Sequence, residues 1–312
     1  MSNDMVGSEE RGAPASPDSF GEAPSGFRLP AATRVGPVRL EIGDLGRSLD
    51  YYTRVLGLRE LDRRDGEAVL VAQGGEAPLV TLVERAGAQP APRRGRLGLF
   101  HFAILLPDRP SLGRFVRHLA GIGARAGSAD HLVSEALYLQ DPDNLGIEVY
   151  ADRPRETWRR AGRQLMMATD PIDAAGLVEA AGPTPWTGMP LGTVMGHVHL
   201  HVGAIDAASA FYSEALGFDR TVWSYPGALF LSAGGYHHHL GTNTWAGPDA
   251  RPAGEHDARL AEWSLDLPDA RSVDAAAASL ARAGFAAERD GSDAITRDPW
   301  GTQLRLRSSA PA

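Results

Sequence analysis

The chain contains no cysteine among its 312 residues. Disulfide bonds and thiolate metal ligands are therefore excluded, and the composition fits a reducing compartment. No apolar stretch approaches the roughly 18 residues that a membrane span needs. The first residues also lack the basic-then-apolar pattern of a secretory signal. We therefore expect a cytoplasmic protein without a membrane partner.

Runs of basic residues are missing as well, and the formal net charge is −8. A nucleic-acid-binding surface needs clustered positive charge, so the sequence argues against nucleic acid as a partner. What the chain does have is apolar content of 43% over 312 residues. That is enough for one large core or two of ordinary size.

The sequence repeats itself. The segment 38–57 returns at 198–217, an offset of 160 (198 − 38), and the segment 101–108 returns at 262–269, an offset of 161 (262 − 101). Internal repeats constrain the architecture more strongly than local propensities do. Differences between the copies then indicate where function lies.

Each repeat begins with a strand and continues into a helix. Val38, Leu40 and Ile42 alternate as in a strand, and the next helix should end at Leu56-Gly57, because glycine suits the left-handed position past a helix end. Further segments are predicted as strands at 67–71 and 79–83, and as helices at 111–121 and 272–283. The unit is therefore βαβββ, repeated four times at about 35–86, 98–152, 194–246 and 259–308.

These units define a domain organisation. Residues 1–32 are rich in Gly, Ala, Pro, Ser and Glu without periodicity, and we expect a disordered tail there. An N-terminal module of two units should span 33–152, and a C-terminal module of two units 194–310. Residues 153–193 are a linker, with a short helix expected at 171–181.

The chain resembles the vicinal oxygen chelate superfamily, with its glyoxalase/bleomycin resistance fold, and within it the catechol-2,3-dioxygenase-like (extradiol) branch. The resemblance covers 35–308 and rests on the segments 100–107, 130–136, 196–201 and 234–239. It implies an α+β fold in which pairs of βαβββ units close into two cup-shaped half-barrels. In this family the floor of a cup holds a divalent metal ion.

The family takes its metal ligands from the first strand of both paired units and from the last strand of one. Carried onto this chain, the matching positions are Pro37, His101, His197 and Glu262 on first strands, and Glu148 and Arg305 on last strands. Only units two and three together supply a complete set, His101, Glu148 and His197. The resemblance therefore implies one metal per chain, pairing of unit two with three and of one with four, and a twin cup without metal. A strand swap in a homodimer could bring the same residues together.

Two neutral imidazoles and one carboxylate leave three positions of a metal ion open, which is typical of non-haem Fe(II) oxygenases. A structural zinc site would instead be filled by four protein ligands. The resemblance implies an extradiol dioxygenase that uses Fe(II), with Mn(II) as the alternative. A catechol-like aromatic and O2 would occupy the open positions, as in aromatic compound catabolism.

Further residues match the family's acid–base and substrate positions. Extradiol enzymes place a proton-transferring histidine in the segment 236–239, and of these His239 and then His237 are favoured. If the segment is a regular strand, these two share a face that is opposite to His238. His131 and Tyr138 match the His and Tyr that precede the metal glutamate, although the spacing from His131 to the turn is about two residues short. Substrate-binding positions are expected at His199, Asn243 and Trp245.

Two alternatives remain open. One is another metalloenzyme of the superfamily, such as a glyoxalase-like isomerase or an antibiotic-modifying transferase. A glyoxalase-type site needs a fourth ligand, usually a carboxylate, near the end of unit three, where this chain has only His237–His239. The other is a small-molecule-binding protein without catalysis, which would hold no metal.

Overall fold

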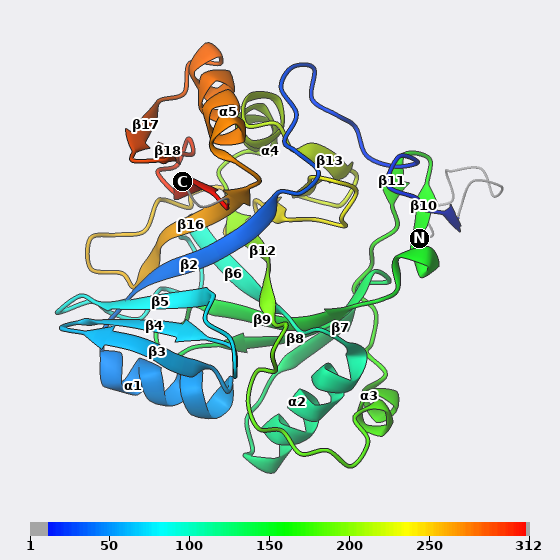
Figure 1. Ribbon diagram of the computed structural model, residues 1–312, viewed down its shortest axis with the longest axis vertical. Coiled ribbons are helices and arrows are strands. Elements are labelled where there is room, and N and C mark those ends of the chain that lie inside the picture. Colours follow the sequence, from blue (N-terminus) through cyan, green and yellow to red (C-terminus); the bar gives the residue numbers. More distant parts are fainter. Residues whose placement is uncertain (1–11, 310–312) are drawn as a thin grey trace.

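The computed structural model describes residues 12–309, which form two eight-stranded sheets and one small three-stranded sheet (Figure 1). The first large sheet has, in spatial order, β13 (Asp219–Val222), β14 (Ala228–Ser232), β15 (Leu240–Asn243), β12 (Val194–His201), β6 (Gly98–Leu105), β9 (Gly146–Asp152), β8 (Ser134–Gln140) and β7 (Gly127–Asp130). The second has β17 (Ala287–Asp290), β18 (Asp293–Arg297), β19 (Gln303–Ser308), β16 (Arg259–Leu267), β2 (Arg34–Ile42), β5 (Pro78–Glu84), β4 (Glu67–Val71) and β3 (Arg59–Arg64).

The central strand pair of each large sheet joins two units from opposite ends of the chain. In the first sheet β6 of unit two pairs antiparallel with β12 of unit three, and in the second β2 of unit one pairs antiparallel with β16 of unit four. The predicted pairing order is confirmed. Each sheet therefore draws on both sides of the linker 153–193, and the sequence segments 33–152 and 194–310 do not each close a cup of their own.

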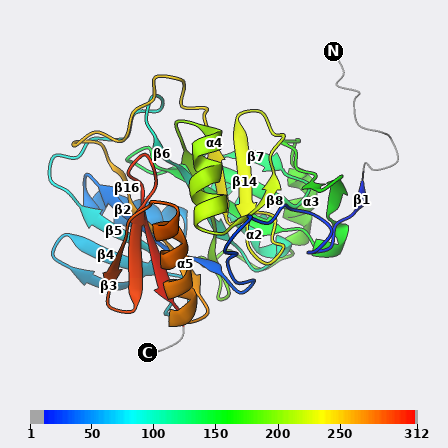
Figure 2. The same ribbon diagram turned by 90° about the horizontal axis from the view of Figure 1, so that it is seen from above.

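Helices pack on the sheet faces that carry the apolar side chains of the strands. The helices are α1 (Leu45–Asp50), which continues as a π-helical turn over Tyr51–Val55, α2 (Arg109–Gly121), α3 (Ala174–Ala180), α4 (Ile205–Ala208), which continues over Ser209–Ala215, and α5 (Ala270–Arg282). Helices α4 and α5 lie beside each other (Figure 2). Phe211, in the continuation of α4, and Phe285, just beyond α5, contact each other with ring centroids 4.8 Å apart. None of the helices within residues 12–309 has the length and apolar character needed to cross a bilayer.

Alternation along β9 shows how this packing leaves one face of the strand for a site. Ile147 and Val149 belong to the core that includes Leu112 and Phe115 of α2, so Glu148 between them points to the other face. The same alternation applies to the other strands of the sheet, because paired residues of neighbouring strands share a face.

The expected disordered tail is wrong for residues 12–32. β1 (Ala13–Pro14) joins β10 (Arg159–Ala161) and β11 (Gln164–Leu165) in the small sheet. Farther along, Phe20 and Leu29 are buried, and the backbone N–H of Leu29 donates to the carbonyl of Gly217 at 2.8 Å. Isolated buried apolar residues such as these show no periodicity, so the sequence of this segment did not indicate that it is ordered. The rest of the predicted tail, residues 1–11, lies outside the described residues.

Candidate metal centre

The sheet brings His101, Glu148 and His197 together on three adjacent strands. One side-chain donor atom of each lies within 4.8 Å of the others, and all three residues are buried. In the strand register His197 and Glu148 both pair with Ala103 of β6. Because paired residues share a face, the small side chain of Ala103 leaves room for the flanking side chains to approach one another. The three residues meet within one chain, so no swapped partner is needed.

The distances and charges of these groups suit a divalent metal ion. His101 Nε2 and His197 Nε2 lie 3.0 and 3.2 Å from the same oxygen, Glu148 Oε2. Burial lowers the pKa of His197 to about 4, so this ring is a neutral ligand at neutral pH. Burial would raise the pKa of Glu148, but His197 and His101 beside it hold that pKa well below its usual range. The short contact between His101 Nε2 and Glu148 lacks hydrogen-bond geometry, and this buried nitrogen has no other polar partner among the described residues, as expected of a nitrogen whose lone pair serves a metal.

The twin cup carries an ion pair in the corresponding place. Arg305 Nε donates to Glu262 Oε1 at 2.9 Å, and Gln303 Nε2 donates to Glu262 Oε2 at 2.6 Å. Pro37 offers only its backbone carbonyl, which accepts from the hydroxyl of Ser264 at 2.6 Å. A fixed guanidinium already neutralises the carboxylate, so this cup is not suited to a cation.

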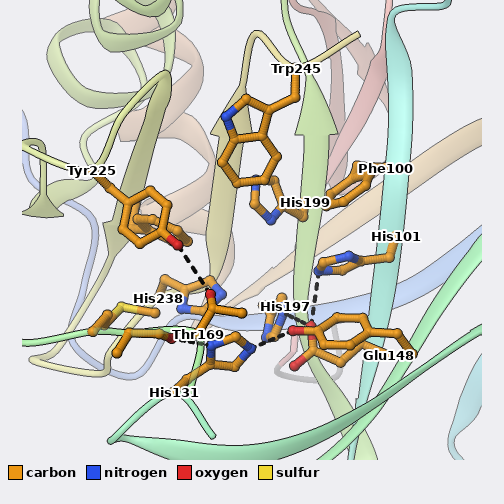
Figure 3. Close-up of a pocket in the computed structure, with 14 residues that line it drawn as sticks. Phe100, His101, His131, Glu148, Thr169, His197, His199, Tyr225, His238 and Trp245 are labelled. Atoms are coloured by element: carbon orange, nitrogen blue, oxygen red, sulfur yellow. Dashed lines mark hydrogen bonds and ion pairs between the residues drawn. The ribbon is translucent and has the colours of Figure 1, made fainter. Parts of the chain in front are cut away.

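A cavity of about 240 Å³ lies over the triad (Figure 3). Its walls are largely apolar and aromatic, with Phe100, Met167, Tyr225, Phe230 and Trp245 among them. Met167 and Thr169 come from the linker between the halves, and the Thr169 hydroxyl lies 3.0 Å from that of Tyr225 in unit three. Among the residues that the structure describes, no lysine or arginine lines this cavity.

The segment 236–239 presents His238 to the cavity, where the sequence favoured His239 and then His237. The His238 ring centroid lies 4.1 Å from that of His197. His239 faces away, and its Nδ1 accepts from the backbone N–H of Ala233 at 3.2 Å. The segment precedes β15 and follows a turn at two glycines with φ +63° and +67°, so it is irregular backbone and not a strand. The two-residue alternation assumed for a strand does not apply to it.

His131 and Tyr138 both line the cavity, as the sequence predicted. His131 Nδ1 lies 2.6 Å from the carbonyl of Ala168, to which it must donate. The Nε2 atom of a neutral ring then accepts from the Tyr138 hydroxyl, with which it is paired. The next residue, Leu132, has a left-handed backbone conformation at φ +68°. Burial and the neighbouring Glu148 raise the pKa of Tyr138 well above its usual value.

The three predicted substrate-binding residues take different places. His199 lines the cavity, and Trp245, 46% exposed, lies at its rim. Asn243 is fully buried behind them and does not line the cavity. Its Oδ1 accepts from the backbone N–H of Trp245 at 3.0 Å and from His201 Nδ1 at 2.6 Å, so its Nδ2 must donate to His199 Nε2, 2.9 Å away. Asn243 therefore fixes the orientation of His199 and has no free polar atom to offer a ligand.

Sequence reasoning missed several lining residues. Met167 and Thr169 lie in the linker, where no periodicity or motif marks them, and Tyr225 and Phe230 read as ordinary packing residues. The sequence did single out the run of three histidines that contains His238, but it did not indicate which of the three points into the cavity.

Comparisons with known proteins agree with this fold. The family model of the Glyoxalase/Bleomycin resistance protein/Dioxygenase superfamily matches residues 34–149 and 194–306. A protein of Bacillus subtilis (strain 168) named catechol-2,3-dioxygenase is 44% identical over 270 residues, which is 86% of this chain and 94% of that protein. Among solved structures, a putative dioxygenase of the same species has a TM-score of 0.62 at 15% identity, covering 92% of this chain and 87% of its own. Glyoxalase I from Zea mays has a TM-score of 0.51 at 19% identity, with 88% and 92% covered. At these identities the two structures indicate a shared fold only.

Proposed function

The chain belongs to the Glyoxalase/Bleomycin resistance protein/Dioxygenase superfamily, and from that premise we propose that it is an extradiol dioxygenase that cleaves a catechol-like ring with O2. The observation that carries this function is the buried set of His101, Glu148 and His197 beneath an aromatic-walled cavity. The extensive identity with a catechol-2,3-dioxygenase supports the same reaction. Both oxygen atoms of O2 end in the product, and the bond that breaks lies beside a hydroxylated ring carbon.

The proposed metal is Fe(II), one per chain, held by the triad. Two imidazoles and one carboxylate on one face of an ion leave positions for a chelating catechol and for O2. When bound, the metal supplies the path by which electrons pass from the catecholate to oxygen. Glu148 is the only carboxylate among the described residues that line the cavity, so a fourth protein ligand of the glyoxalase type is missing.

Protein side chains perform the remaining tasks. His238 is proposed as the acid–base group, since it lies beside His197 and within the cavity. Its Nε2 would take the proton of a catechol hydroxyl and later return it to the oxygen on the cleaved ring. His131 and Tyr138, paired through their ring nitrogen and hydroxyl, would orient the substrate oxygens from the other side. The apolar walls exclude water from the reacting atoms.

The experiment is oxygen uptake after anaerobic reconstitution with Fe(II), or with Mn(II) in parallel, followed by catechol and air. A yellow ring-opened product should form. His101→Ala should lose both the bound iron and the uptake. Its matched control is Glu262→Ala, at the same strand position of the twin cup, which leaves Arg305 paired with Asp290 and should retain both. Uptake by the wild type no greater than that of H101A across a panel of catechols would overturn the proposal.

A further inference from the structure

Behind His238 a chain of hydrogen bonds runs away from the cavity to an acidic residue. His237 Nδ1 lies 2.7 Å from His238 Nδ1, and His237 Nε2 lies 2.9 Å from Asp152 Oδ1. Asp152 is the last residue of β9, the strand that carries Glu148. One strand thus supports both a proposed metal ligand and the end of this hydrogen-bonded chain.

The chemistry of the three groups sets the direction of each hydrogen bond. A carboxylate only accepts, so His237 Nε2–H donates to Asp152. A neutral His237 then has its lone pair on Nδ1, and His238 Nδ1–H must donate to it. His238 Nε2 is left with a lone pair. Within residues 12–309 no protein group forms a hydrogen bond with this atom, and the residue lines the cavity.

The ring of His237 is enclosed by other aromatic rings, which fix its orientation. Its side chain is fully buried, with ring centroids of Trp158 and Tyr150 at 5.5 and 6.0 Å. The ring of His197, a proposed metal ligand, lies 6.2 Å away.

The far end of the chain is itself held in place. The Tyr236 hydroxyl donates to Asp152 Oδ1 at 3.1 Å. The Tyr150 hydroxyl, 2.7 Å from that of Tyr236, must then donate to it in turn. Asp152 therefore has little freedom to turn its Oδ1 away from His237.

We propose that Asp152 and His237 are positioning residues that hold His238 as its Nδ1–H tautomer, with the Nε2 lone pair directed at the bound ring. This inference rests on the proposed function, in which His238 Nε2 receives a substrate proton. A base must present a lone pair, and the other tautomer would present an N–H bond to the catechol. An acid that orients a base through its second nitrogen is a general solution to this problem.

Two substitutions of His237 separate positioning from packing. In His237→Asn the amide oxygen lies near the place of Nδ1 and can still accept from His238 Nδ1–H. In His237→Phe the ring still packs against Trp158 and Tyr236, but the acceptor is gone. We expect H237F to lose at least about tenfold in kcat, out of the ~10²–10⁴ that general acid–base catalysis contributes. Its KM for catechol and its iron content should stay within about twofold of the wild type, and H237N should retain most of the wild-type kcat.

The tautomer itself is measured by nitrogen-15 NMR of the histidine rings, in the metal-free and the zinc-loaded full chain, because zinc is diamagnetic. We expect the wild type and H237N to show His238 protonated at Nδ1, and H237F to show a mixture. A wild-type His238 protonated at Nε2 overturns the inference, whether or not any variant folds. Equal kcat in H237F and wild type overturns it as well. If the wild type opens no catechol ring, the proposed function fails, and the nitrogen spectrum alone decides the tautomer.

Discussion

His239 offers a quantitative test of the burial of the histidine cluster, because it lies outside the cavity. Burial lowers its pKa to about 3, whereas the unfolded chain should titrate near ~6.5. Below pH ~6.5 the unfolded chain therefore binds a proton that the folded protein does not. The contribution of His239 to the free energy of unfolding should therefore be complete above pH ~6.5 and decrease progressively as the pH falls below that value.

The magnitude follows from the width of this window. At pH 5 the unfolded histidine is almost fully protonated and the folded one almost fully neutral, so about 1.5 pH units at ~1.36 kcal/mol each give about 2 kcal/mol. His239→Asn removes the titration, while the amide oxygen can still accept from the backbone N–H of Ala233. The difference in unfolding free energy between pH 7 and pH 5 should be about 2 kcal/mol smaller in H239N than in the wild type.

Urea denaturation of the metal-free protein, with a chelator present, measures this difference at both pH values. His256→Asn, at an exposed loop position, is the matched control and should leave the difference as in the wild type. A variant that is only generally destabilised would give a stability curve parallel to that of the wild type. Parallel curves for H239N would refute the reasoning, because they would mean that His239 binds protons alike in both states.

Three further predictions concern other parts of the structure. A methyl group at Gly196 would lie 1.9 Å from the Tyr150 hydroxyl oxygen. Gly196→Ala should therefore lower the free energy of unfolding, measured by urea denaturation, by about 1–3 kcal/mol and weaken iron binding. In the control Gly121→Ala the added carbon meets nothing within 4 Å, so neither quantity should change. Burial raises the pKa of Asp141 to about 7, so the folded protein keeps a proton that the unfolded chain releases near pH ~3.9. This proton stabilises the folded protein by about 4 kcal/mol at low pH, and the stabilisation is lost as the pH rises to 7. Asp141→Asn should therefore flatten the decline of the unfolding free energy between pH 4 and 8 in denaturation curves. Trp245→Ala should raise the KM for catechols about threefold or more through the loss of an aromatic contact worth ~1 kcal/mol, with kcat unchanged in oxygen-uptake assays.

The resemblance to the family, carried onto equivalent positions of the repeats, predicted the triad that the structure brings together. His101, Glu148 and His197 lie on regular strands, where equivalent positions of different units can be aligned by a constant offset and where alternation fixes the face. The same resemblance implied the pairing of the units, since only units two and three together supply the family's complete ligand set. In regular secondary structure, the direction of a side chain can therefore be predicted from its position in the sequence.

Other parts of the site depend on irregular backbone, which carries no such signal. His238 lies in irregular backbone after the turn at Gly234 and Gly235, so the alternation of a regular strand does not give the direction of its side chain. Met167 and Thr169 reach the cavity because the linker crosses over it, a path that depends on long-range packing. The burial of Phe20 has the same origin, and composition alone predicted disorder there.

The interleaved pairing of the sheets has a consequence for the order of folding during synthesis. Leu40 of β2 pairs with Leu260 of β16, a separation of 220 residues (260 − 40), whereas Phe102 pairs with Val198 at a separation of 96 (198 − 102). All eight strands of the sheet that carries His101, Glu148 and His197 lie between residues 98 and 243, so that sheet can close while β16 is still to be made. Strand β2 is among the first strands to be synthesised, but it can pair with β16 only after most of the chain has been made. A chain truncated before residue 259 would keep the metal ligands but leave an open β2 edge prone to aggregation.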